Sequence, residues 1–174
     1  MNRKLWVDKR FNFEFPSSEY ESLIETLSAA PQRLTALLGG LSHEVLIRKP
    51  EGSWSLQENA GHLMSLEALF VGRLDDYEAG ATGLRAADMS NQATDTAQHN
   101  GSNISDILEG FATVRGDYIQ RLRGHPAAWF ATVAHHPRLD QPMRVVDQLK
   151  FQAAHDAHHF QRIEDLLAGS QPSG

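Results

Sequence analysis

Apolar residues recur at spacings of three and four along four segments of the chain, and this spacing predicts four amphipathic helices. The first segment lies near residues 19–38, the second ends near residue 77, the third covers roughly residues 104–122 and the fourth roughly residues 144–167. The stripe on the second segment is typical and consists of Leu56, Ala60, Leu63, Leu66, Phe70 and Leu74. The sequence therefore predicts an all-α fold, a four-helix bundle.

Capping and helix-breaking residues mark the ends of these segments. A serine cap for the second helix is available at Ser53 or Ser55, and Ser102 or Asn103 can cap the third. Glycine or proline follows each of the first three segments, at Gly39 and Gly40, at Gly80 and Gly83, and at Gly124 and Pro126.

The connection between the second and third helices is long, from about residue 80 to residue 103. A segment of that length can cross from one end of a bundle to the other, so the two helices are expected to be parallel neighbours. Such loops often carry function, although a solvated crossover fits the same composition. No repeat or linker suggests a second domain, and residues 1–174 are expected to form one domain.

Composition narrows the function classes. Lys and Arg number 16 against 22 Asp and Glu, and the resulting net charge of -6 disfavours nonspecific binding to nucleic acid. No apolar run approaches the roughly 20 residues needed to cross a membrane, and the N-terminus lacks the pattern of a signal peptide. A cytoplasmic protein without membrane or nucleic-acid partners is expected. The absence of cysteine excludes disulfides, thiolate zinc sites and a cysteine nucleophile.

Histidines near the C-terminus give the strongest chemical signal. His155 and His159 are four residues apart, so on a helix both rings can reach one ion. His158 competes with His159, because His155 and His158 also lie one turn apart, and spacing does not choose between the two pairs. A third candidate ligand, His62, lies on the second predicted helix, which can pack opposite the fourth.

Burial makes a metal site the stronger interpretation of these histidines. His62 shares a helix face with Leu66 and Leu69, so its ring is expected to point inward. Three buried imidazoles are costly unless something shared accepts their lone pairs, whereas exposed or singly hydrogen-bonded histidines need no metal. Three neutral imidazoles also leave a coordination position open, as in catalytic sites. Zinc is the expected ion, with nickel, iron and copper compatible with the same ligands.

Other polar and aromatic residues support weaker hypotheses. Arg73 and Arg144 could bind an anionic substrate near the metal, although an ordinary ion pair explains each equally well. Asp156 faces a different side from His155 and is expected to hydrogen-bond a metal ligand or to be an interhelical partner, rather than to be a ligand itself. Trp54 is expected to be a core anchor. Residues 135–138 (HHPR) can line a pocket mouth, while their proline indicates an ordinary turn.

Several short stretches together resemble the DinB-like (DinB/YfiT) superfamily. They are WSLQENAGHL at residues 54–63, HDAHH at 155–159, ADMSN at 87–91 and HPRL at 136–139, and the resemblance covers nearly the whole chain. It implies a four-helix bundle in up-down-down-up order, which agrees with the long second connection. It also implies a three-histidine metal site at His62, His155 and His159.

The resemblance also implies candidate reactions. Characterised members include metal-dependent thiol transferases and a thiol-dependent isomerase, so the leading hypothesis is a metal-dependent transferase that uses a low-molecular-weight thiol on an electrophilic small molecule. Other members are described as hydrolases, which is the first alternative. The second alternative is a noncatalytic, metal-binding stress protein. Dimers are common among these relatives, so a homodimer is also expected.

Overall fold

Four long helices form the molecule, as the apolar spacing predicted. The computed structural model describes residues 11–88 and 92–169. Its long helices are α1 (Tyr20–Leu38), α3 (Leu56–Glu78), α5 (Ile104–Arg123) and α6 (Val145–Gly169). None of the helices in the described part of the chain is long and apolar enough to cross a membrane.

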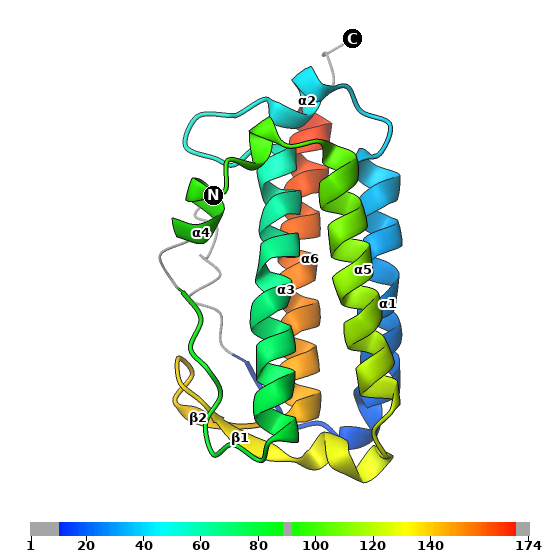
Figure 1. Cartoon of the computed structure of the whole chain (residues 1–174), viewed down its shortest axis with the longest axis vertical. Coiled ribbons are helices and arrows are strands. Elements are labelled where there is room, and N and C mark those ends of the chain that lie inside the picture. The colour runs from blue at the N-terminus through cyan, green and yellow to red at the C-terminus, as the bar shows by residue number, and fades with distance from the viewer. Residues whose placement is uncertain (1–10, 89–91, 170–174) are drawn as a thin grey trace.

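The helices follow the predicted up-down-down-up order. The chain ascends in α1, descends in both α3 and α5, and ascends again in α6 (Figure 1). α1 packs against α5 and α6, and α3 packs against the same two helices. α3 and α5 are thus parallel neighbours, and the connection between them returns along the length of the bundle, as its length predicted.

Side-chain caps fix where two of the helices begin. Ser55, rather than Ser53, caps α3: its Oγ accepts a hydrogen bond from the Glu58 amide at 3.0 Å, and the Glu58 carboxylate accepts one from the Ser55 amide at 2.8 Å. Asn103, rather than Ser102, caps α5 by accepting a hydrogen bond from the Ser105 amide. The cap on α3 fixes the start of the helix that carries His62.

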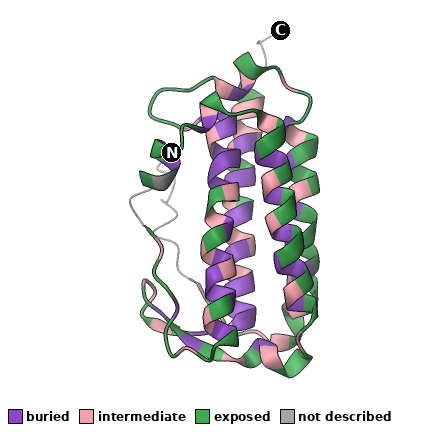
Figure 2. Cartoon of the chain, viewed as in Figure 1, coloured by how far each residue is buried: buried purple, intermediate pink, exposed green. Residues whose placement is uncertain are grey.

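Apolar side chains fill the bundle in two clusters, one towards each end, and the buried faces of the helices point at one another (Figure 2). The cluster near the connection from α1 to α3 includes Leu34, Leu38, Leu63, Phe111 and Phe160. The cluster at the other end includes Leu27, Phe70, Leu122, Phe130 and Leu149. Burial of these aliphatic and aromatic groups is the main stabilising contribution to the fold.

Several short elements lie outside the four predicted segments. Among the described residues they are the helices α2 (His43–Ile47) and α4 (Gln92–Thr96), three 3-10 turns, and an antiparallel hairpin of β1 (Val133–His136) and β2 (Gln141–Arg144). His135 and His136 lie in β1, so a turn was the wrong interpretation for these two residues. The chain reverses only after them, at residues 137–140. Segments of four or five residues are too short for apolar periodicity to reveal.

Two glycines within α3 let the crossover lie close to that helix. A Cβ atom at Gly61 would collide with the ring of His99, and one at Gly72 would collide with the guanidinium of Arg85. The crossover therefore approaches α3 more closely than a helix with larger residues at these positions would permit.

Candidate metal centre

Three histidines from two helices meet inside the bundle. His62 on α3 and His155 and His159 on α6 are buried, with exposed fractions of 8%, 4% and 4%. One ring nitrogen from each lies within 4.8 Å of one from each of the others. Packing of α3 against α6 thus brings together the three residues predicted as ligands. His62 and His155 are 93 residues apart in the sequence.

One pair of these nitrogens has the spacing expected of two ligands on a shared ion. His62 Nε2 and His155 Nε2 are 3.3 Å apart. Two imidazole nitrogens, each about 2.05 Å from one tetrahedral ion, would be separated by roughly 3.3 Å. The cluster contains only imidazoles, and three such ligands leave part of a tetrahedral shell for another group.

Hydrogen bonds hold two of the rings on the side away from the cluster, and one of these bonds also sets the protonation of its ring. Asn59 Nδ2 donates to the Ser55 carbonyl at 2.8 Å, so its Oδ1 is the atom that lies 3.0 Å from His159 Nδ1. An amide oxygen can only accept, and His159 Nδ1 must therefore carry the proton, which leaves a lone pair on Nε2. His62 Nδ1 lies 2.9 Å from the hydroxyl of Thr94 on α4. These partners orient the rings as outer hydrogen bonds do in metal sites.

Burial keeps the three rings neutral. It lowers the pKa of His62 to about 4, with the nearby positive groups of His99, Arg162 and His158 acting in the same direction. Burial likewise holds the pKa of His155 and of His159 well below the usual value for histidine. Neutral imidazole is the form that binds metal ions, so at neutral pH all three are ready to do so.

Of the two histidine pairs left open by spacing, the structure brings together His155 and His159. His158 is only partly buried and is outside the group of three, although its ring stands perpendicular to that of His159 with the centroids 5.2 Å apart. A helix turns about 100° per residue, so neighbours such as His158 and His159 face different directions.

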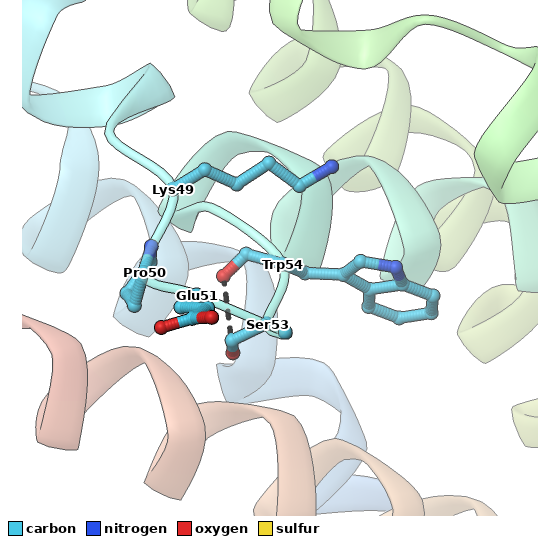
Figure 3. A pocket seen from close by; sticks show the side chains of 6 residues that line it. Lys49, Pro50, Glu51, Ser53 and Trp54 are labelled. Atoms are coloured by element: carbon cyan, nitrogen blue, oxygen red, sulfur yellow. Dashed lines mark hydrogen bonds between the residues drawn. The ribbon is translucent and has the colours of Figure 1, made fainter.

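Trp54 lies beside the histidines, and its expected role as a core anchor was wrong. Its ring centroid is 4.9 Å from that of His62 and 6.1 Å from that of His159, and it is only partly buried. It ends the loop of residues 49–54, which lines an open surface pocket of about 520 Å³. In Figure 3 the side chains of Trp54 and Lys49 extend to the same side of this loop. The indole therefore forms one wall beside the cluster.

Asp156 belongs to a separate buried network, which confirms its predicted role between helices. It lies 2.8 Å from Arg115, whose guanidinium also contacts Glu67 at 2.7 Å and donates to the Leu27 carbonyl at 3.0 Å. These four residues come from α6, α5, α3 and α1, so one arginine links all four long helices.

The two arginines predicted to bind substrate have different surroundings. Arg73 is 1% exposed and donates to two neutral oxygens, the Arg85 carbonyl at 3.1 Å and Gln148 Oε1 at 3.3 Å. Arg144 is partly exposed, pairs with Asp147 at 2.7 Å and donates to the carbonyls of Phe13 and Phe15. Substrate binding by either residue stays a prediction.

Sequence reasoning did not identify the partners of the histidine rings. Asn59 and Thr94 are ordinary polar residues in the sequence, and each becomes significant only through a ring brought to it by the fold. Asn59 lies on α3 one turn before His62, and this spacing is the one signal that could have pointed to it.

Comparison with known proteins agrees with this architecture. A family model described as the DinB superfamily matches residues 26–163. Among solved structures, the chain is similar to YfiT from Bacillus subtilis, described as a probable metal-dependent hydrolase with an unusual four-helix bundle topology. The TM-score is 0.80 at 17% sequence identity, and the match covers 91% of each chain. At that identity the likeness shows a shared fold. No match was found among the curated proteins.

Proposed function

The chain belongs to the DinB superfamily, and from this premise we propose that it is a metal-dependent enzyme whose ligands are His62, His155 and His159. One observation carries the proposal: three buried, neutral imidazoles from two helices converge to within 4.8 Å of one another. A shared ion would accept the lone pairs that these neutral rings direct into the buried space.

The centre would favour zinc, with nickel and iron as alternatives that imidazole also binds. When bound, such an ion lowers the pKa of a thiol or a water molecule that it coordinates. Asn59 and Thr94 hold the His159 and His62 rings in place, and the Trp54 indole restricts water on one side of the cluster.

The reaction that we propose first is transfer of a low-molecular-weight thiol to an electrophilic small molecule. It is supported by the resemblance to thiol transferases of this superfamily. It also agrees with the absence of cysteine, because the chain has no sulfur nucleophile of its own and a cosubstrate would supply it.

Hydrolysis is the second candidate, favoured by the shared fold with YfiT, itself described as a probable metal-dependent hydrolase. In that case the group activated at the centre would be water. A noncatalytic metal-binding stress protein is the third. The cytoplasmic location and the homodimer expected from the sequence stay predictions.

Metal binding is tested on protein purified without an affinity tag. We expect one divalent ion per chain by elemental analysis, lost in His62→Ala and in His159→Ala. His158→Ala is the matched control, because it removes the adjacent histidine on the same helix and should keep the ion. Wild-type protein that binds no divalent ion after incubation with zinc, nickel or iron would refute the proposed centre, as would loss of the ion from His158→Ala alone.

Activity assays then separate the three functions. Metal-loaded protein is mixed with electrophiles, such as an alkyl halide or an epoxide, with and without small thiols, and also with ester and amide substrates. Turnover that requires the thiol supports the transferase, and turnover without it supports the hydrolase. A bound ion with no turnover in either assay would favour the noncatalytic protein. His159→Ala, treated in the same way, controls for contaminating enzymes.

A further inference from the structure

A second group of buried polar side chains lies nearer the start of α6 than the histidines do. At this level α3 and the β hairpin both lie beside α6. Arg73 is on α3, His136 on β1 and Gln148 on α6, and each is at most 2% exposed. Arg138 follows in the hairpin turn and is partly buried. The group lies outside the metal centre and has no part in the metal binding proposed above.

Contacts show that these side chains are close together. Arg73 donates to Gln148 Oε1 at 3.3 Å. The ring of His136 and the guanidinium of Arg138 both contact Phe151, at 5.5 and 5.6 Å from its ring centroid. Gln148 and Phe151 are three residues apart on α6 and hence on the same side of it, so all four polar groups lie around one turn of this helix.

Two buried donors in this group have no acceptor among the described residues. His136 Nδ1 accepts a hydrogen bond from the Leu139 amide at 3.2 Å, so in the neutral ring the proton is on Nε2. That Nε2 atom is buried without a hydrogen-bond partner, and so is Gln148 Nε2, because the other amide atom of Gln148 already accepts from Arg73. Buried donors left without acceptors are costly, which points to an acceptor that binds there.

The positive charge of Arg73 also points to an acceptor that binds in this group. Both hydrogen bonds that Arg73 makes to described residues end on neutral oxygens, and the carboxylate of Asp76 that acts on it from nearby is itself paired with Arg85. Arg115 provides a contrast within the same bundle, since Glu67 and Asp156 both contact it directly. A buried guanidinium is stable only when its charge is compensated, and no carboxylate in residues 11–88 or 92–169 contacts Arg73 as Glu67 and Asp156 contact Arg115.

The titration behaviour of the group fits this description. Burial, and after it the positive charge of Arg138, lowers the pKa of Arg73 to about 10, although Tyr77 and Asp76 act in the opposite direction. Burial, with Arg73 and Arg138, also lowers the pKa of His136 to about 4. These groups therefore destabilise one another as cations, and a bound anion would relieve that repulsion.

We propose that Arg73, His136 and Gln148, with Arg138 beside them, form a binding site for the carboxylate or phosphate group of a small molecule. Guanidinium N–H groups, the imidazole Nε2–H and an amide N–H are the donors that recognise such an anion. Gln148 precedes His155 by seven residues, which is about 10 Å along a helix. Resting on the proposed function, we further assign the substrate or thiol cosubstrate to small molecules that carry such an acidic group.

The site is tested by isothermal titration calorimetry of chelator-treated protein at low ionic strength, with malonate and inorganic phosphate as probes. We expect saturable binding of at least one probe, weakened about tenfold or more in Arg73→Met and in His136→Leu, as loss of a charge-assisted hydrogen bond predicts. Binding of malonate alone identifies a carboxylate site, and binding of phosphate alone identifies a phosphate site. Because the protein carries no metal in this experiment, failure of the proposed metal centre would leave its outcome unchanged.

Arg121→Met is the matched control, because Arg121 lies on α5 and already has Asp75 and Glu78 as acceptors. It should bind the probes as the wild type does. An apolar replacement of Arg73 removes an incompletely compensated buried charge, so Arg73→Met is expected to fold, and the melting temperature of each variant checks this. Absence of saturable binding to the wild type, or equal binding to Arg73→Met and His136→Leu, would overturn the proposal.

Discussion

At the scale of single residues, the geometry of the metal centre depends on side chains that do not touch the ion. Asn59 is the clearest case, because one amide holds two partners at once: its Nδ2 donates to Ser55 and its Oδ1 faces His159. The same helix cap that starts α3 therefore also fixes the side chain that orients a ligand from α6.

Replacing Asn59 should weaken metal binding without removing a ligand. In Asn59→Leu the His159 ring loses the acceptor that holds its Nδ1 proton, so its Nε2 lone pair is no longer held in one direction. We expect an affinity for zinc that is lower by roughly ten- to a hundredfold, measured by competition with a chromogenic chelator. Gln161→Leu removes an exposed amide on α6 and is the control. Equal zinc affinities in the two variants would contradict this role for Asn59.

The residues of the centre differ in how readily the sequence reveals them. Helical spacing predicted His155 together with either His158 or His159, and only the resemblance chose His159. His62 was predictable from its place on an apolar helix face, and the resemblance named the same three. Thr94 was not, because nothing in a polar crossover indicates that it will meet a ring 32 residues earlier in the chain.

At the scale of elements, periodicity predicted α3 and α6 to within two residues at each end, since the apolar stripe of a long helix extends over many turns. It could not predict the hairpin or α4. These elements are short, and their positions depend on packing against α3 and α6 rather than on their own sequence pattern. The parallel arrangement of α3 and α5 was predictable from the length of the crossover, and the resemblance implied the same order.

The fit of the crossover to α3 should be sensitive to Gly61. An added methyl group would collide with the His99 ring, so Gly61→Ala should displace the segment that also carries Thr94. We expect a loss of stability of about 1–3 kcal/mol in chemical denaturation. Gly116→Ala on α5 is the matched control, because nothing lies within 4 Å of the added atom, and alanine should stabilise this helix by about 0.5–1 kcal/mol. A neutral or stabilising Gly61→Ala would show that the crossover does not rely on this contact.

At the scale of the whole molecule, the bundle contains two kinds of buried charge. Arg115 is compensated by two carboxylates and joins all four long helices. The group around Arg73 is rich in donors, and in the described part of the chain no carboxylate contacts that arginine directly. The first arrangement stabilises one packing of the helices. The group around Arg73 lies nearer the start of α6 than the metal centre does. α3 and α6 together would therefore hold a metal site and an anion site at two levels of the bundle.

Removing Arg115 should test how far the fold depends on this link. Arg115→Met leaves Glu67 and Asp156 buried without a counterion, and we expect a loss of about 3–5 kcal/mol in chemical denaturation at pH 7. Arg121→Met breaks exposed ion pairs with Asp75 and Glu78 and should change stability by less than about 1 kcal/mol. Losses of similar size in both variants would show that the buried network has no special role.

The pH dependence of the same variant gives the sign of the effect. Burial raises the pKa of Glu67 and of Asp156, and Arg115 opposes that rise, so removing it should raise both values further. A carboxyl whose pKa is higher in the folded than in the unfolded protein makes the folded state bind more protons as the pH falls. The deficit of Arg115→Met relative to the wild type should therefore shrink as the pH falls towards about 4, the ordinary pKa of these groups. A deficit that is constant from pH 8 to pH 5 would mean that lost packing, and not the two uncompensated carboxylates, destabilises the variant.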